Sequence, residues 1–265
     1  MNLPPAYELT DVVFRYPDST ALDGLNLSIA PGECVAVLGA NGSGKSTLLR
    51  VLAGLCFPER GRVEFAGAEL TESALAQDDA FARNFRKRVG VVFQNPDVQL
   101  FNATVFDEVA FGPLQMAWSK EEIVERVYAA LQDLGIEHLK DRPPHRLSGG
   151  EKKRVALASV LVLDPDVLLM DEPAAALDPQ SQGQMIDFLF GCMGKKTIVT
   201  TTHSLEIALE IADRCVVLEN GRLAGSGPTA EVLQDHALLE RTHLLHTHRH
   251  RHPSGAVHSH PHRHH

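Results

Sequence analysis

The stretch GANGSGKST, from Gly39 to Thr47, decides how the rest of the chain is interpreted. It fits the pattern G-x-x-x-x-G-K-[ST], in which glycines let successive backbone N–H groups turn inward around phosphate oxygens. The run CVAVL before it is typical of a buried strand, and KSTLLRVLAG after it is typical of a helix whose positive end faces the anion. A glycine-rich turn without a ligand is the alternative, but the strand–loop–helix context favours a phosphate loop.

The residue types in this loop predict separate roles. Lys45 is expected to reach the β- and γ-phosphates of a nucleotide, and the Ser46 hydroxyl to ligate Mg²⁺. The predicted nucleotide-binding residues of the loop are Gly39, Asn41, Gly42, Ser43, Gly44, Lys45, Ser46 and Thr47.

The sequence on either side predicts an α/β fold. YELTDVVFRY and ALDGLNLSI alternate between apolar and polar residues, which indicates antiparallel strands. Later apolar runs, VLLMD, KTIVTTTH and RCVVLEN, are separated by helical patterns, as in parallel sheets covered on both faces. We predict one domain over residues 1–235, with a helical subdomain at about 95–163. A histidine-rich tail, expected to be disordered, follows over 236–265.

A second acidic motif follows one of these strands. VLLMDE, from Val167 to Glu172, ends in two adjacent carboxylates, and ligands bind at the carboxyl edge of parallel sheets. Asp171 is expected to hold Mg²⁺, directly or through water, and Glu172 to polarise an attacking water. Many strands simply end in solvated acids, but the phosphate loop in the same chain favours the functional interpretation.

The segment LSGGEKKRVALASVLVLDPDVLLMDEP, from Leu147 to Pro173, resembles the ATPase subunit of ATP-binding cassette (ABC) proteins. The resemblance spans about residues 7–233. It implies a P-loop NTPase fold of the ABC type, with a mixed-sheet core, an antiparallel β subdomain and an inserted helical subdomain. It also implies that the chain binds and hydrolyses ATP with Mg²⁺, with Lys45, Glu172 and His203 as the catalytic residues.

The resemblance assigns roles to four further residues in order along the chain. Tyr16 matches the aromatic that stacks on adenine, and Gln94 the glutamine that senses Mg²⁺ and the transport partner. Asp178 matches the aspartate that contacts the opposite subunit, and His203 the histidine that contacts the γ-phosphate. Taken alone, Tyr16 would be interpreted as an ordinary aromatic of a strand and Gln94 as a surface amide. His203 would likewise be interpreted as a histidine of the core. Their order around two phosphate motifs favours the family roles.

The signature residues Ser148, Gly149 and Gly150 precede a predicted helix and would present a hydroxyl and bare N–H groups at its positive end. In the family this surface faces the phosphate loop of a second subunit, which implies a head-to-tail dimer, expected to be a homodimer, with two ATP molecules between the subunits. Glu151 stands where the family often has glutamine, and Ala174 to Ala176 replace a stretch that often contains Thr or Ser. Neither departure implies lost hydrolysis, because Lys45, Asp171, Glu172 and His203 are present.

The segment QNPDVQLFNATVFDEVAFGPLQM, from Gln94 to Met116, looks like the ATPases of energy-coupling-factor importers, which take up vitamins or nickel and cobalt ions. In the wider family this region receives a helix of the membrane subunit. Phe101, Phe106 and Phe111 could form an apolar floor for that helix, or could pack the helical subdomain, and the sequence leaves both open.

The composition and charge of the chain restrict the kinds of partner and the cellular location that we expect. A net charge of -9 argues against a nucleic-acid partner, which usually faces a basic stripe. No apolar run approaches the length of a membrane span, and the N-terminus lacks a signal-peptide pattern, so we expect a peripheral protein at the cytoplasmic face of the cell membrane. The four scattered cysteines, Cys34, Cys56, Cys192 and Cys215, are expected to be reduced.

The chain ends in HTHRHRHPSGAVHSHPHRHH, which begins at His246. Histidines spaced by two share one side of an extended chain, and imidazole suits Ni²⁺, Co²⁺, Zn²⁺ and Cu²⁺. Interleaved Thr, Arg, Ser and Pro favour a native tail over a purification tag. The candidate ligands are His246, His248, His250, His252, His258, His260, His262 and His264.

Together these features predict an ATPase subunit that energises a membrane importer of cobalt or nickel ions. A vitamin importer of the same group is the first alternative, and in that case the tail is incidental. A soluble cassette ATPase acting on DNA or ribosomes is the second, and the acidic charge and the lack of a second cassette or long coiled coil disfavour it.

Overall fold

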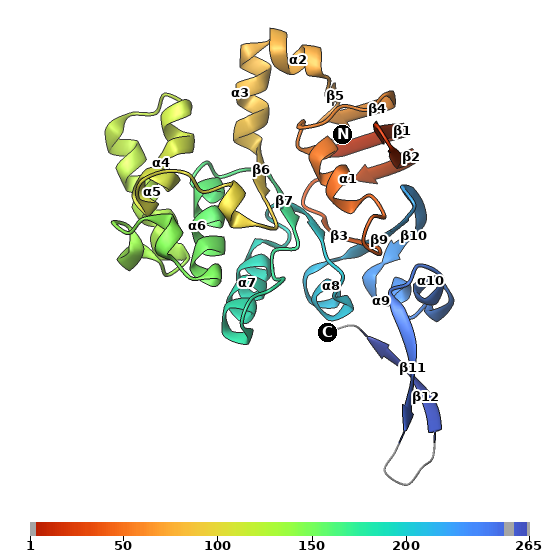
Figure 1. The fold of residues 1–265 in the computed structure, drawn as a ribbon. Helices are drawn as coiled ribbons and strands as arrows, with labels where there is room; N and C mark the ends of the chain where they lie inside the picture. Colours follow the sequence, from red (N-terminus) through yellow and green to blue (C-terminus); the bar gives the residue numbers. More distant parts are fainter. Residues whose placement is uncertain (1–3, 252–256, 264–265) are drawn as a thin grey trace.

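The computed structural model describes residues 4–251 and 257–263, with side chains through Leu245. Its central layer is a six-stranded sheet, beside which lie an antiparallel sheet, a group of helices and a C-terminal hairpin (Figure 1). The predicted architecture, a mixed sheet with an antiparallel β region and an inserted helical region, is confirmed.

The six-stranded sheet has the order β10-β9-β3-β8-β7-β6, and all its neighbouring pairs are parallel except β10 with β9. The central strands are apolar on both faces because helices cover both, as the continuous Val, Ile and Leu runs predict. Its strands are β3 (Cys34–Leu38), β6 (Val89–Val92), β7 (Val167–Asp171), β8 (Thr197–Thr201), β9 (Arg214–Glu219) and β10 (Arg222–Pro228). The helices α1 (Lys45–Leu52), α7 (Pro179–Cys192) and α8 (Leu205–Ile211) connect or cover them.

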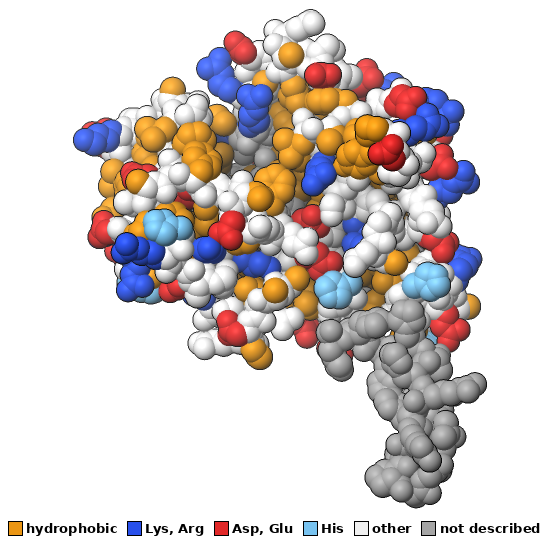
Figure 2. Space-filling view, viewed as in Figure 1, with side chains coloured by type: hydrophobic (Ala, Val, Ile, Leu, Met, Phe, Trp, Pro, Cys, Tyr) orange, Lys and Arg blue, Asp and Glu red, His pale blue; other side chains and the backbone are white. Residues whose placement is uncertain are grey.

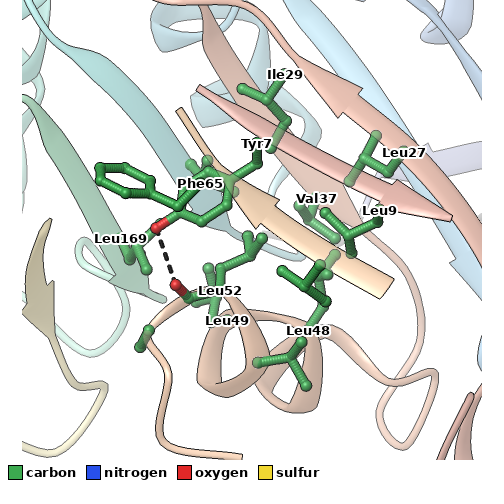
Figure 3. Packing of buried hydrophobic residues seen from close by; sticks show 14 of the residues in the cluster. Tyr7, Leu9, Leu27, Ile29, Val37, Leu48, Leu49, Leu52, Phe65 and Leu169 are labelled. Carbon is green, nitrogen blue, oxygen red and sulfur yellow. Dashed lines mark hydrogen bonds between the residues drawn. The ribbon is translucent and has the colours of Figure 1, made fainter. Parts of the chain in front are cut away.

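The antiparallel sheet has the order β2-β1-β4-β5 and packs over α1. Tyr7 is fully buried between the two, and its hydroxyl donates a hydrogen bond of 2.8 Å to the carbonyl oxygen of Leu52 (Figure 3). Its ring lies 5.3 Å from that of Phe65. This contact fixes the sheet against the helix that carries the phosphate loop. Its strands are β1 (Tyr7–Tyr16), β2 (Ser19–Ile29), β4 (Arg60–Phe65) and β5 (Ala68–Glu69).

Two helices lead from the antiparallel sheet into β6, and a helical region then lies between β6 and β7 (Figure 1). The helical region has its own hydrophobic cluster, which includes Val109, Val127 and Val155, so it can pack as a unit beside the sheet. The helices are α2 (Glu72–Gln77), α3 (Asp79–Arg88), α4 (Val105–Gln115), α5 (Lys120–Asp133) and α6 (Gly149–Leu161), with 3₁₀ turns at Pro96–Val98, Glu137–Leu139 and Pro144–Arg146.

The chain continues with regular structure beyond residue 235, where the sequence predicted a disordered tail. Helices α9 (Thr229–Val232) and α10 (His236–Arg241) pack against the sheet, and Leu244 and Leu245 are buried with them. Burial of these leucines explains why the ordered body extends further than the loss of periodicity suggested.

Strands β11 (Leu245–Arg251) and β12 (Val257–Arg263) form an antiparallel hairpin after α10 (Figure 1). Its backbone register sets His246 opposite His262, His248 opposite His260, and His250 opposite His258. Because successive strand positions alternate between faces, these six positions share one face of the ribbon. The candidate ligands His252 and His264 lie outside the described residues.

Candidate active site

The phosphate loop connects β3 to α1 at the carboxyl edge of the sheet. Gly39 and Gly44 have φ of 153° and 108°, and a Cβ on either would lie within 2.5 Å of a backbone oxygen, that of Leu218 and that of Ala21. Glycine is therefore required at both positions by space and by backbone conformation. Gly42, with φ of 81°, faces open space, so a side chain there would enter the hollow that the loop surrounds.

Lys45 is the first residue of α1, and its side chain folds back over the loop. Its ammonium donates hydrogen bonds to the carbonyl oxygens of Gly39 at 2.6 Å and Ala40 at 3.1 Å. Burial lowers the pKa of Lys45, and the nearby carboxylates of Glu172 and Asp171 counteract this effect. The carboxylates thus help to keep a positive charge at the mouth of the loop, where a phosphate would lie.

Asp171 is the last residue of β7 and Glu172 follows it, beside the end of β8. The Thr201 hydroxyl donates to Asp171 Oδ1 at 2.5 Å, and the backbone N–H of Glu172 donates to Thr201 Oγ1 at 3.0 Å. Thr201 therefore fixes both acids against the neighbouring strand. Glu172 has φ of 48°, a left-handed conformation that is uncommon for a residue other than glycine and turns the chain sharply after the strand.

His203, just after β8, is in contact with Glu172. Its Nδ1 lies 3.0 Å from each carboxylate oxygen of Glu172. The Glu172 side chain is 11% exposed and that of His203 is 53% exposed, so the imidazole reaches the acid from the solvent side. The structure thus brings together two of the three residues predicted to be catalytic, with Lys45 on the adjacent loop.

The phosphate loop, Asp171 and Glu172 line a hollow of about 310 Å³ between the loop, β2 and the end of β7. Tyr16, at the end of β1, and Gln94, just after β6, also line it. The Tyr16 hydroxyl accepts a hydrogen bond of 3.1 Å from the guanidinium of Arg50, on α1. Tyr16, the loop, Gln94, Asp171 and Glu172 therefore line one hollow, which His203 approaches through its contact with Glu172.

The chemistry of the hollow fits a nucleotide phosphate and a hard cation. Ser43 Oγ, inside the loop, is buried without a hydrogen-bond partner in the described part of the chain. The N–H groups of the first turn of α1 have no intrahelical acceptor and lie beside the Lys45 ammonium. The Ser46 hydroxyl, the Gln94 amide and the Asp171 carboxylate supply oxygen atoms of the kind that Mg²⁺ prefers.

The signature residues lie apart from this hollow. Ser148 is the N-cap of α6, and a capping box joins it to Glu151: the Ser148 N–H donates to Glu151 Oε2 at 2.7 Å and the Glu151 N–H to Ser148 Oγ at 3.3 Å. Gly149 and Gly150 are the first residues of α6 rather than residues before it. The hydrogen bond from the Ser148 N–H lowers the pKa of Glu151, which explains how this acid is accommodated where the family often has glutamine.

Asp178 lies near Gly150 and is the N-cap of α7. Its Oδ1 accepts from the backbone N–H groups of Gln180 and Ser181 at 3.1 and 3.0 Å. Hydrogen bonds from Ser181 lower the pKa of Asp178. Within a single protomer, Asp178 therefore caps α7. Like Ser148 and Gly149, it lies away from the phosphate loop.

The three phenylalanines after Gln94 have different surroundings. Phe101 and Phe111 are exposed and contact each other with ring centroids 5.0 Å apart. Phe106 packs against the hydrophobic cluster of the helical region, near Tyr128. Of the two roles that the sequence left open, packing of the helical subdomain describes Phe106, whose ring contacts the helical core. Hydrophobic side chains gather over this helical region on the face seen in Figure 2.

Two residues of this site were not anticipated from the sequence, Thr201 and Lys153. Thr201 bonds to Asp171 only because β7 and β8 are neighbours, and the sequence does not state which strands pair. Lys153, on α6, is 7% exposed and reaches the loop after Glu172. The capping box of Ser148 and Glu151 could have been found from the pattern S-x-x-E before an apolar run.

Comparisons with known proteins agree with this geometry. The model of the family described as ABC transporter matches residues 22–175. The nickel import ATP-binding protein NikO of Rhodobacter capsulatus is 56% identical over 247 residues, covering 92% of this chain and 97% of that protein. An energy-coupling factor transporter ATP-binding protein, EcfA2 of Methanospirillum hungatei, is 42% identical over 91% of this chain and 60% of its own length.

Solved structures are also similar. The cbiO1 structure from Clostridium perfringens, described as part of the ABC transporter complex cbiONQ, has a TM-score of 0.76 at 38% identity and covers 91% of this chain and 95% of that chain. A dimeric ATP-binding cassette in a post-hydrolysis state, bound to ADP and Pi, has a TM-score of 0.75 at 28% identity, with 84% and 98% covered.

The fold and the site define a P-loop ATPase, and the chain belongs to the ABC transporter family. It is an ATP-binding, ATP-hydrolysing cassette of the kind that serves as a transporter subunit. Within residues 4–251 and 257–263, no helix combines the length and the apolar character that a membrane span needs.

Proposed function

We propose that this chain hydrolyses ATP to energise a membrane importer of nickel or cobalt ions. The observation that carries the proposal is the 56% identity to a nickel import ATP-binding protein over 92% of the chain. The likeness to cbiO1, part of a transporter complex, supports it further. The competing proposal is an energy-coupling-factor importer that carries a vitamin, and the 42% identity to the energy-coupling factor transporter protein EcfA2 supports the importer group without indicating the cargo.

The residues in and beside the hollow have different proposed roles in ATP hydrolysis. Lys45 and the backbone N–H groups from Gly39 to Thr47 would bind the β- and γ-phosphates of ATP, and Tyr16 would stack on adenine. Ser46, Gln94 and Asp171 would hold Mg²⁺, which when bound neutralises phosphate charge. Glu172 accepts a proton from the attacking water, and His203, which contacts Glu172, stabilises the transferred phosphoryl group.

The site is complete only in a head-to-tail dimer, expected to be a homodimer. Ser148 and Gly149 are exposed at the N-terminus of α6, and in one protomer they do not line the hollow. A helix N-terminus with free N–H groups suits a phosphate anion, so this surface would complete the ATP site of a second copy. The dimeric cassette with bound ADP and Pi supports the same assembly.

The membrane subunits would dock at the cytoplasmic face on Phe101 and Phe111. Phe101 is held on the surface by Glu108, a buried acid of α4 whose Oε2 accepts from the N–H groups of Phe101 and Asn102 at 2.8 and 2.7 Å. Phe101 is 67% exposed although hydrogen bonds hold its backbone, which is typical of a hydrophobic residue at an interaction site. Gln94, seven residues earlier, would link this surface to the nucleotide site.

Replacing Phe101 with alanine should weaken assembly without affecting the fold. We expect the Phe101→Ala variant to co-purify with its membrane subunits about tenfold less efficiently, since exposed aromatic anchors dominate such contacts. Phe190→Ala is the matched control, because Phe190 on α7 is also 67% exposed. Equal recovery of membrane subunits with both variants would remove the docking role of Phe101.

The C-terminal hairpin would bind transition-metal ions delivered to or released by the importer. The register that sets three histidine positions opposite three others on one face supports this, because pairs of imidazoles chelate Ni²⁺, Co²⁺ or Zn²⁺. Imidazole binds these metals in its neutral form, so the affinity should fall as pH drops below about 6.5.

Cellular uptake of labelled Ni²⁺ and Co²⁺ tests the cargo and the tail together. We expect uptake to require the chain, and deletion of residues 246–265 to reduce uptake at low external metal but not at saturating metal. The deletion begins after Leu245, because Leu244 and Leu245 are buried and belong to the body. Metal uptake that is unaffected by loss of the whole chain would favour a vitamin cargo.

A further inference from the structure

Lys153 makes an unusual set of contacts for a lysine. It lies on α6, five residues after the N-cap Ser148, and only 7% of it is exposed. Its ammonium donates to three backbone carbonyl oxygens, those of Ala175 at 2.5 Å, Pro173 at 3.1 Å and Glu172 at 3.2 Å. An ammonium has three N–H donors, so this set satisfies all of them.

The three acceptors belong to one loop, which runs from Glu172 to Asp178 between β7 and α7. The loop contains two residues other than glycine with left-handed backbone, Glu172 at φ 48° and Ala176 at φ 57°. Such conformations persist only where surrounding contacts enforce them. Thr201 holds the N–H of Glu172, and Lys153 adds contacts along the loop, because its hydrogen bonds draw the carbonyl groups of residues 172, 173 and 175 toward one point.

No carboxylate hydrogen-bonds to Lys153 among the described residues, so backbone dipoles alone solvate its charge. Burial lowers the pKa of Lys153, and the negative charge of Glu172 counteracts this effect. A buried ammonium is costly unless hydrogen-bonded, so the lysine and the loop conformation depend on each other. Moving the loop away would leave a buried cation without acceptors.

The helix that carries Lys153 begins at the signature residues. Its neighbours reach other segments: Lys152 pairs with Asp97 at 2.6 Å, three residues after Gln94, and Arg154 bonds to Gln184 on α7. Three consecutive basic residues thus connect α6 to three separate segments of the chain. Lys153 is the one whose partners include Glu172 itself.

We propose that Lys153 is a positioning residue for hydrolysis: it fixes the loop after β7 to the signature helix and thereby sets the orientation of Glu172. This rests on the proposed role of Glu172 as the base. Lys153 does not line the nucleotide hollow, so it acts on the chemical step and not on ATP binding.

The test compares steady-state ATPase kinetics of the full chain and its Lys153→Met variant, which keeps an unbranched side chain and removes all three donors. We expect kcat to fall about 100-fold, as for misplacement of a reacting group, with the KM for ATP changed by less than about twofold. Lys153→Gln, which restores a donating amide on a shorter side chain, should recover part of the lost kcat. Lys120→Met, at an exposed position on α5, is the control and should retain the ATPase rate of the unmodified chain.

The outcomes separate the possibilities. A normal kcat in Lys153→Met overturns the proposal. So does a parallel loss of kcat and ATP affinity with no recovery in Lys153→Gln, because that pattern indicates misfolding of the site as a whole. Glu172→Gln is measured alongside: if it retains hydrolysis, the assignment of the base fails, whereas a dead Glu172→Gln with a fully active Lys153→Met rejects only the role of Lys153.

Discussion

Replacing Glu172 with glutamine is expected to reduce ATP hydrolysis by about 10²- to 10⁴-fold, the range usual for loss of a general base. Glutamine keeps the size of the side chain and can still contact His203, but it cannot accept a proton from water. The Lys45 ammonium, the loop N–H groups and Tyr16 are untouched, so ATP should bind as before. Phosphate release and the equilibrium binding of a fluorescent ATP analogue measure the two effects separately.

A control for the change of charge is Glu125→Gln, on the exposed side of α5, which should retain full activity. The variant Glu172→Gln should also accumulate as an ATP-bound dimer, detectable by size-exclusion chromatography with light scattering, because reopening requires hydrolysis. Full turnover in Glu172→Gln would show that another group activates the water.

Placing aspartate at Gly149 is expected to lower ATP hydrolysis about 100-fold while leaving ATP binding to the single protomer intact. A Cβ at Gly149 meets nothing within 4 Å, so the Gly149→Asp protomer has room for the new side chain. An acid in the first turn of α6 also interacts favourably with the helix dipole, so the melting temperature should not fall. In the dimer, however, the carboxylate would face the γ-phosphate bound by the other subunit and repel it.

The companion variant is Gly191→Asp on α7, where a Cβ also meets nothing within 4 Å. It adds the same charge far from the signature and should hydrolyse ATP normally. Mixing Gly149→Asp with Glu172→Gln provides a second check: a mixed dimer contains one site with both intact residues and should regain activity. If Gly149→Asp hydrolyses ATP normally alone, the signature does not act across a subunit boundary.

The sequence predicted the parts of the fold that depend on residues close together in the chain. The phosphate loop is recognisable because its glycines, Lys45 and Ser46 lie within one short stretch of consecutive residues. The strands β3, β7, β8 and β9 are recognisable as apolar runs. Helices α2 and α3 were not identified, since they are short and highly polar, with only Ala82 and Phe85 buried among their residues.

The contacts that could not be predicted join segments distant in sequence. Nothing near Lys153 in the chain indicates that its ammonium meets carbonyl groups 19 to 22 residues later. Thr201 becomes a partner of Asp171 only through the pairing of β7 with β8. The start of the tail was placed too early for a related reason: the leucines between Leu238 and Leu245 meet residues of β3 and β9 in one cluster, and those strands are distant in sequence.

The arrangement of the chain around the central sheet also has an evolutionary consequence. The lysine, carboxylates and histidine proposed for ATP chemistry lie at the carboxyl ends of β3, β7 and β8, and the signature helix α6 faces them from the helical region between β6 and β7. Phe101 and Phe111 are exposed before α6, and the histidine-rich hairpin follows the last helix, so substitutions in these two places leave the sheet and the signature helix in position. Selection for a different cargo or membrane partner can therefore change these exposed surfaces while the residues that bind and hydrolyse ATP stay the same.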